Sequence, residues 1–68
     1  MNRLTLLANL ETDIQVALSL LKLKKGLRDV SETRLVGNVF ACEILTTLDK
    51  QQVQSLLSSR FGRAIQVR

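Results

Sequence analysis

Histidine, tyrosine, tryptophan and proline are all absent from this sequence of 68 residues, and cysteine occurs once. Histidine is the side chain most often used as a general base, and tyrosine is a frequent alternative, so we expect a protein that is not an enzyme in its own right. One cysteine without histidine cannot supply the usual ligands of a zinc site. The three glycines are scattered and form no phosphate-binding loop. We therefore expect no catalytic residue, no metal and no cofactor.

The single cysteine, Cys42, cannot form an internal disulfide and follows Ala41 in an apolar segment. We interpret it as a small core residue. A lone cysteine suits a reducing compartment, and the N-terminus lacks the features of a secretory signal, so we expect a cytoplasmic protein. The longest uncharged stretches are shorter than the roughly 20 apolar residues that a membrane helix needs; they are residues 14–21, 35–42 and 51–59. No membrane span is predicted.

The chain shows no linker, repeat or low-complexity segment, which predicts a single small domain over residues 1–68. Hydrophobic residues make up 46% of it. A domain this small buries only about 60% of the surface that its unfolded chain exposes, and the leucines between Leu4 and Leu27 exceed what one thin core readily hides. That excess indicates self-association or a partner.

Apolar residues in the N-terminal third recur at helical spacing. Steps of three and four residues join a first stripe, which consists of Leu7, Leu10, Ile14, Ala17 and Leu21. A second stripe beside it consists of Val16, Leu20, Leu23 and Leu27. This period predicts a helix over residues 3–25 with an unusually wide apolar sector. Lys24 and Lys25 followed by Gly26 suit a helix end, because cations face the negative end of the helix dipole and glycine adopts the left-handed conformation.

The next segment predicts a second helix, from about Val30 to about Leu48. Asp29 followed three residues later by Glu32 fits a capping box, and apolar residues then recur on two adjoining faces. Gly37 costs such a helix about 1 kcal/mol relative to alanine, and the β-branched residues of this segment also suit a strand. An alternative α+β fold, with residues 35–45 as a strand, therefore stays open.

The last third predicts a shorter helix and a tail. Asp49 serves as its cap with Gln52 three residues on, and Gly62 ends it. Residues 63–68 then alternate between apolar and polar side chains, as a short strand does. The predicted fold class is therefore all-α, with three helices that form a helical hairpin plus a shorter third helix, followed by a short C-terminal strand or tail.

Two segments resemble known structural patterns. Residues 16–48, with the turn KKGLRDVSE between two apolar stretches, resemble the helical-hairpin co-chaperones of type III secretion needles, which implies a helical hairpin. Residues 46–68 resemble the helix, glycine and strand that end many small α+β domains. Neither resemblance contains a diagnostic motif, so no functional residue is transferred from it.

The wide apolar sector of the predicted N-terminal helix is the main indication of function. We expect a non-enzymatic protein-binding module, a regulatory adaptor or small chaperone, that forms a homodimer or a complex with another protein. No small-molecule substrate is expected. The contact residues predicted for the partner are Leu10, Ile14, Leu21 and Leu23.

The positive charge of the chain supports an alternative function. The net charge is +4, and residues 22–34 are rich in lysine and arginine. Phosphate contacts dominate nucleic-acid affinity, so the alternative is a dimeric nucleic-acid-binding transcriptional regulator. Its expected contacts are Lys22, Lys24, Lys25 and Arg28. Lysines at a helix end also favour the dipole and solubility, so the charge alone does not decide between the two functions.

Overall fold

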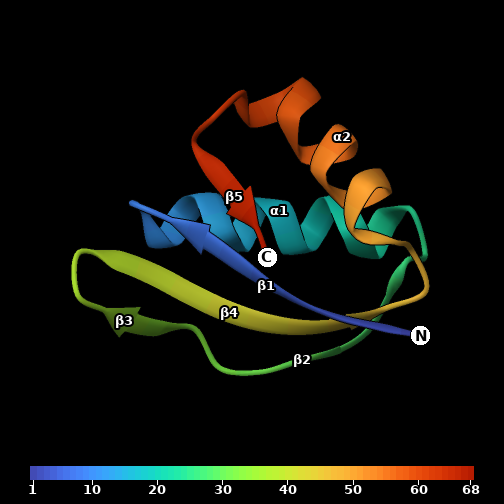
Figure 1. Cartoon of the computed structure of the whole chain (residues 1–68), viewed down its shortest axis with the longest axis horizontal. Coiled ribbons are helices and arrows are strands. Elements are labelled where there is room, and N and C mark those ends of the chain that lie inside the picture. The colour runs from blue at the N-terminus through green and yellow to red at the C-terminus, as the bar shows by residue number, and fades with distance from the viewer.

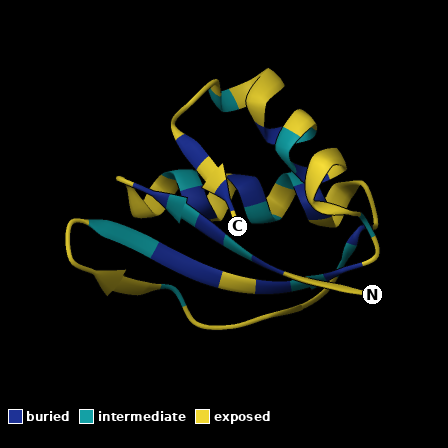
Figure 2. Ribbon diagram, in the orientation of Figure 1, coloured by how far each residue is buried: buried dark blue, intermediate teal, exposed yellow.

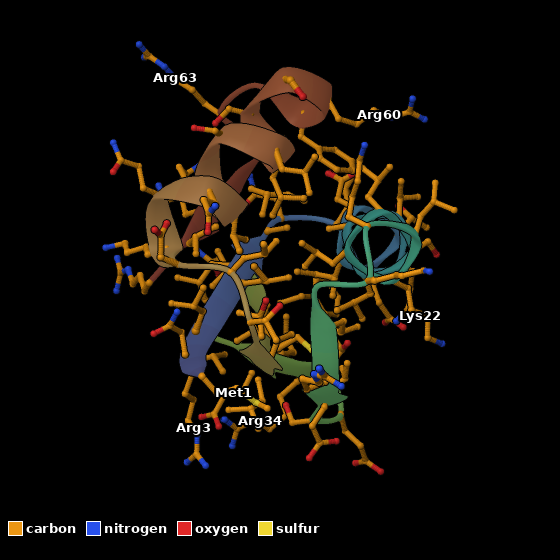
Figure 3. The ribbon with its side chains drawn as sticks, turned by 90° about the vertical axis from the view of Figure 1, so that its right-hand side faces the viewer. Met1, Arg3, Lys22, Arg34, Arg60 and Arg63 are labelled. Carbon is orange, nitrogen blue, oxygen red and sulfur yellow. The ribbon has the colours of Figure 1, made fainter.

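The computed structural model describes residues 1–68 and contains two helices and one antiparallel sheet of five strands (Figure 1). In chain order the elements are β1 (Asn2–Ala8), α1 (Glu11–Leu23), β2 (Leu27–Val30), β3 (Arg34–Val36), β4 (Val39–Thr46), α2 (Lys50–Phe61) and β5 (Ile65–Val67). The strand order is β2-β4-β1-β5, and β3 also pairs with β4. Both helices lie against the same face of the sheet (Figures 1 and 3). The all-α prediction with three helices is wrong, since the fold is α+β.

The strands β2 and β3 pair with successive parts of β4 and act as one interrupted strand. Counted so, the chain has the order β-α-β-β-α-β with two interleaved halves, which is the ferredoxin-like arrangement. Many unrelated functions occur on this arrangement. The function of this chain therefore depends on the surfaces that it presents and not on its fold alone.

The predicted helix over residues 3–25 is wrong in its first part, because residues 2–8 form β1. Side chains of a strand alternate between two faces, and in β1 the residues Leu4, Leu6 and Ala8 are buried while those between them are more exposed. The helical spacing between Leu7 and Leu10 was coincidental. From Glu11 onward the prediction is confirmed, since α1 runs to Leu23.

The end of α1 differs in detail from the expected one. The left-handed residue is Lys25, with a φ of 57°, and Gly26 follows it. The amide of Gly26 donates to the carbonyl of Leu21 and that of Lys25 to the carbonyl of Lys22, which is the Schellman pattern. Glycine is needed at position 26 because of space and not because of its φ. A Cβ there would lie 2.7 Å from Cδ1 of Leu48. Gly26 allows the α1–β2 turn to approach the β4–α2 turn.

Replacing Lys25 with glycine is expected to stabilise the protein. A side chain in the left-handed conformation is strained, and glycine is not. We expect Lys25→Gly to raise the free energy of unfolding by about 0.5 to 1 kcal/mol, measured by urea denaturation. Lys24→Gly is the control, because Lys24 has a φ of −83° and glycine there should lower stability. A lower midpoint for Lys25→Gly than for the unmodified protein would contradict this assignment.

The predicted second helix does not exist, because residues 27–46 form β2, β3 and β4. Gly37 and Asn38 connect β3 to β4, and Val36 pairs with Val39 across this two-residue turn. The φ of Gly37 is +63°, which the first central position of a type II′ hairpin requires. The capping box proposed for Asp29 is also absent, since its Oδ1 accepts from the adjacent amide of Val30. The resemblance to helical-hairpin co-chaperones is thereby wrong.

The predictions for the last third are confirmed. Asp49 and Gln52 form a reciprocal capping box, in which Asp49 Oδ1 accepts from the amide of Gln52 at 2.7 Å and Gln52 Oε1 from that of Asp49 at 3.0 Å. The helix α2 ends at Gly62, whose φ is +63°. Residues 65–67 then form β5, which pairs with β1. The tail is thus a strand of the sheet.

The hydrophobic core lies between the helices and the sheet (Figure 2). It draws residues from both helices and from β1, β4 and β5. Twelve buried residues form one cluster: Leu4, Leu6, Ala8, Ile14, Ala17, Leu21, Cys42, Ile44, Val53, Leu57, Ile65 and Val67. Cys42 is 1% exposed, so its interpretation as a core residue is confirmed. The other face of the sheet has no helix on it.

Candidate functional site

The face of the sheet that the helices leave uncovered is the candidate site, and we call it the open face. Residues paired across neighbouring strands share a face, so the register with β1 and β4 assigns its members. They are Arg3, Thr5 and Leu7 on β1, Val39, Ala41, Glu43 and Leu45 on β4, Asp29 on β2, Arg34 and Val36 on β3, Gln66 on β5, and Arg68 directly after β5. In Figure 3, Arg3 and Arg34 point away from the helices on this side.

The strand β4 is mostly apolar on both of its faces, with Thr46 on the helix side and Glu43 on the open face as its polar members. Cys42, Ile44 and Thr46 face the helices and are buried. On the open face β4 carries Val39, Ala41 and Leu45 beside a single charge, Glu43. A strand of an antiparallel sheet that faces water on one side normally alternates apolar and polar residues, whereas a strand covered on both sides is apolar throughout. The composition of β4 is therefore typical of a strand with both faces covered.

Apolar side chains of the open face already shield one another in part. Ala41 is only 6% exposed although no helix lies over it. Its cross-strand neighbours are Leu7 on β1 and Arg34 on β3, and both are larger side chains. Leu7 itself is half-buried. The small side chain of Ala41 thus leaves a depression at the middle of the open face, beside the larger side chain of Leu7.

Two cross-strand rows of the open face each place opposite charges on opposite sides of the sheet, while a third row has the cation Arg34 on the β2–β4 side, across the sheet from the neutral Gln66. One cross-strand row runs from Asp29 through Leu45 to Arg3. The next row runs from Glu43 through Thr5 to Arg68, whose backbone exchanges hydrogen bonds of 2.6 and 2.8 Å with Thr5. In both rows the carboxylate lies on the β2–β4 side and the guanidinium on the β1–β5 side.

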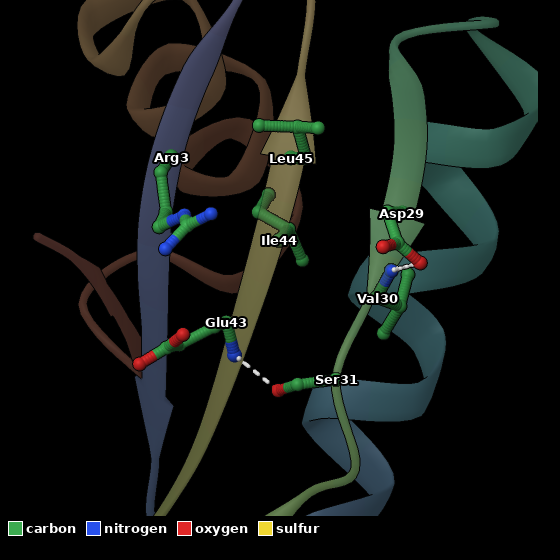
Figure 4. A pocket seen from close by; sticks show the side chains of 7 residues that line it. All are labelled: Arg3, Asp29, Val30, Ser31, Glu43, Ile44 and Leu45. Carbon is green, nitrogen blue, oxygen red and sulfur yellow. Dashed lines mark hydrogen bonds between the residues drawn. The ribbon is translucent and has the colours of Figure 1, made fainter.

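A shallow hollow of about 210 Å³ lies at the first of these rows (Figure 4). Its lining consists of Arg3, Asp29, Val30, Ser31, Glu43, Ile44 and Leu45. The amide of Glu43 donates to Oγ of Ser31 at 2.9 Å, which ties the segment after β2 to β4. The carboxylates of Asp29 and Glu43 and the guanidinium of Arg3 remain exposed. These groups can form ion pairs and hydrogen bonds with an external partner.

The structure separates the residues predicted to bind a partner. Ile14 and Leu21 are both 0% exposed, within the core. Leu10 and Leu23 are exposed by 58% and 77%, but they flank the two ends of α1, about 20 Å apart for a helix of this length. The four residues therefore do not form one surface. Val16, at 39% exposure, is the other large apolar residue that α1 presents.

The residues of the predicted nucleic-acid contact lie at one corner of the molecule, where α1 ends and β2 begins. Lys22, Lys24, Lys25 and Arg28 are all exposed there. Other cations point elsewhere: in Figure 3, Arg3 and Arg34 lie on the sheet side, while Arg60 and Arg63 lie on the opposite side with α2. The positive charge is distributed around the molecule, and no observation favours this function over protein binding.

Comparison with protein-family models, with curated proteins and with solved structures gave no match. Neither helix has the length and apolar character needed to cross a membrane. The structure contains no group of three or more His, Cys, Asp or Glu side chains that could hold a metal ion. The candidate site is accordingly defined by its geometry alone.

Sequence reasoning missed the open face because it placed both of its main strands in helices. A signal was present in each case. Residues 3–6 alternate between polar and apolar side chains, and residues 39–46 are a short, mostly apolar run that follows a Gly-Asn pair. Such a pair between two strand-like runs is a hairpin signal.

Proposed function

We propose that this chain is a small, non-enzymatic protein-binding module that acts through the open face of its sheet. The observation that carries the proposal is the apolar character of β4 on the side without helices. Val39 and Leu45 remain partly exposed to water, and covering them with another protein removes apolar surface, which contributes about 25 cal/mol per Å². The charges beside them supply specificity, as charged groups do around the apolar centre of an interface.

The proposed contact surface is the open face of the sheet and not α1, which the sequence had predicted. In α1 the first apolar stripe packs against the chain's own sheet, so Ile14 and Leu21 are not accessible to a partner. Leu10 and Leu23 remain accessible, but each stands alone at its end of the helix. A regulatory adaptor that works as a dimer or as part of a hetero-complex remains the role that we propose. A cytoplasmic setting belongs to the same proposal, since the free thiol of Cys42 suits a reducing compartment.

Leu45→Arg is expected to abolish partner binding without unfolding the protein. Leu45 lies on the open face beside Arg3 and is half-buried, so a second guanidinium there places like charges within the proposed contact. The measurement is chemical cross-linking in cells followed by mass spectrometry of everything joined to the tagged chain, a second copy included. We expect cross-linked products to fall at least about tenfold, which corresponds to about 1.4 kcal/mol of binding free energy.

Val16→Arg is the matched control, because Val16 is an exposed apolar residue on α1. It should leave the cross-linked products unchanged, and circular dichroism should show that both variants are folded. If the products persist in Leu45→Arg and disappear in Val16→Arg, the contact surface is α1 and the proposal for the open face is wrong.

A further inference from the structure

We propose that the partner on the open face is a second copy of this chain, packed face to face about a two-fold axis that runs parallel to the strands. This inference rests on the proposed function and names the partner. Two-fold dimers are the commonest oligomers, and their interface must be complementary to itself. The open face meets that requirement in both its charges and its shape.

The two edges of the sheet are poor routes to association by strand pairing. At one edge, β2 contains a bulge between Leu27 and Asp29 and is separated from β3 by residues 31–33. At the other edge, β5 has only three residues, and the outward amide of Val67 donates to Oε1 of Gln54 from α2 at 3.3 Å. Bulges, short strands and covering side chains are the usual means of blocking edge pairing. Packing through the face is the remaining route for the sheet.

The sorted charges become complementary under this two-fold axis. Rotation about an axis between β1 and β4 lays the β1–β5 side of one copy over the β2–β4 side of the other. Arg3 of one copy then lies over Leu45 of its partner, beside the partner's Asp29, and Arg68 comes to the segment beside Glu43. Arg34 lies over the neutral Gln66 of the partner, and the like charge nearest to it is the partner's Arg68, one row away. No cross-strand row of the open face sets a charge directly opposite one of the same sign.

The apolar centre is complementary under the same rotation. Leu7 and Ala41 are cross-strand partners on β1 and β4, so the axis places Leu7 of each copy over Ala41 of the other. A large side chain thus meets a small one twice, as the interdigitated layers of stacked sheets require. A β-bulge or an inserted charge at either position would remove the fit. The chain has neither at this pair.

The area of the open face determines how tightly we expect the dimer to associate. The sheet contains 25 strand residues, and at about 3.3 Å per residue and 4.8 Å between strands they cover about 400 Å², so two copies bury about 800 Å² together. That area lies below that of stable interfaces and is typical of weak, transient ones. We therefore expect a reversible dimer with a dissociation constant of about 10 to 100 μM, which forms and separates with concentration.

Sedimentation velocity of the purified full chain between 1 and 500 μM tests the proposal through a charge exchange. Arg3→Glu sets two carboxylates side by side in its own dimer, and Asp29→Arg does the same with two guanidinium groups. Each variant alone should dissociate about tenfold more readily. An equimolar mixture of the two restores both pairs and should form a dimer as tight as that of the unmodified chain. Arg60→Glu makes the same charge change on α2 and should have no effect.

A monomer at 500 μM, or a dimer that Arg3→Glu does not weaken, overturns the inference. So does a mixture of the two variants that stays as weak as each alone. Circular dichroism of every variant separates dissociation from unfolding. Cellular cross-links that still depend on Leu45, to a protein other than this chain, would then leave the proposed function standing while the second copy is rejected.

Discussion

Leu21→Asp is expected to unfold the protein. Leu21 is 0% exposed and belongs to the cluster between α1 and the sheet. The substitution removes a large buried side chain, which costs about 2 to 5 kcal/mol, and adds a carboxylate that cannot be hydrated in the core. A domain of 68 residues has a total stability of about 3 to 10 kcal/mol. The variant should therefore lose its cooperative thermal transition by circular dichroism.

Leu23→Asp is the control for this prediction. Leu23 is two residues further along the same helix but 77% exposed, and surface substitutions usually change stability by no more than about 0.5 kcal/mol. Its melting temperature should fall by no more than a few degrees, because an aspartate at the C-terminal end of a helix opposes the helix dipole by only about 0.3 to 1 kcal/mol. A folded Leu21→Asp variant with a transition within a few degrees of the unmodified protein would show that α1 does not pack as the structure has it.

Thr46→Val is expected to destabilise the protein strongly although the two side chains have nearly the same shape. Thr46 is 0% exposed, and its hydroxyl donates to the carbonyl of Gly26 and accepts from the amide of Leu48 at 3.1 Å. Valine leaves the amide of Leu48 without this partner and removes one of the bonds to Gly26. An unsatisfied buried polar group costs about 1 to 3 kcal/mol, so we expect a loss of about 1 to 3 kcal/mol in urea denaturation.

Thr47→Val is the matched control, since Thr47 is the next residue and is exposed. Its backbone amide keeps the second bond to the carbonyl of Gly26, at 3.1 Å, whatever the side chain. We expect its free energy of unfolding to stay within about 0.5 kcal/mol of the unmodified value. Equal stability of Thr46→Val and Thr47→Val would mean that the hydroxyl of Thr46 does not join the two turns.

The sequence predicted correctly the elements whose local signals agree with the structure that they form. The helix α2 was found because Asp49, Gln52 and Gly62 each have a local physical role there, and β5 because alternation is visible even in three residues. The body of α1 was found because its apolar period continues well beyond the length of a strand. In each of these cases the local signal and the tertiary structure agree.

The prediction errors arose in segments whose residues fit both a helix and a strand or turn. Leu7 and Leu10 stand three apart, which fits a helix, yet Leu4, Leu6 and Ala8 stand two apart and fit the strand that forms. Gly37 destabilises the predicted helix, whereas in the structure it forms a hairpin turn together with Asn38. Periodicity cannot decide short apolar runs, and β1 and β4 stabilise each other only once both are extended.

The open face could not be derived from the sequence even with correct strands. Which residues share a face follows from cross-strand register, for example the alignment of Asp29, Leu45 and Arg3. That register depends on the bulge in β2 and on the turn at Gly37, and a slip by one residue would exchange the two faces of a strand. The sorting of charges is thus a property of the assembled sheet.

The interleaving of the two halves has a consequence for how the chain reaches its native state. The central pair of the sheet joins β1 to β4, and all of α1, β2 and β3 lie between them in the sequence. The entropy of closing that long loop must be overcome before the pair forms, and such topologies fold more slowly than helical bundles of equal length. Residues 1–30 alone would therefore remain unstructured, since the strand that β1 needs has not yet been synthesised.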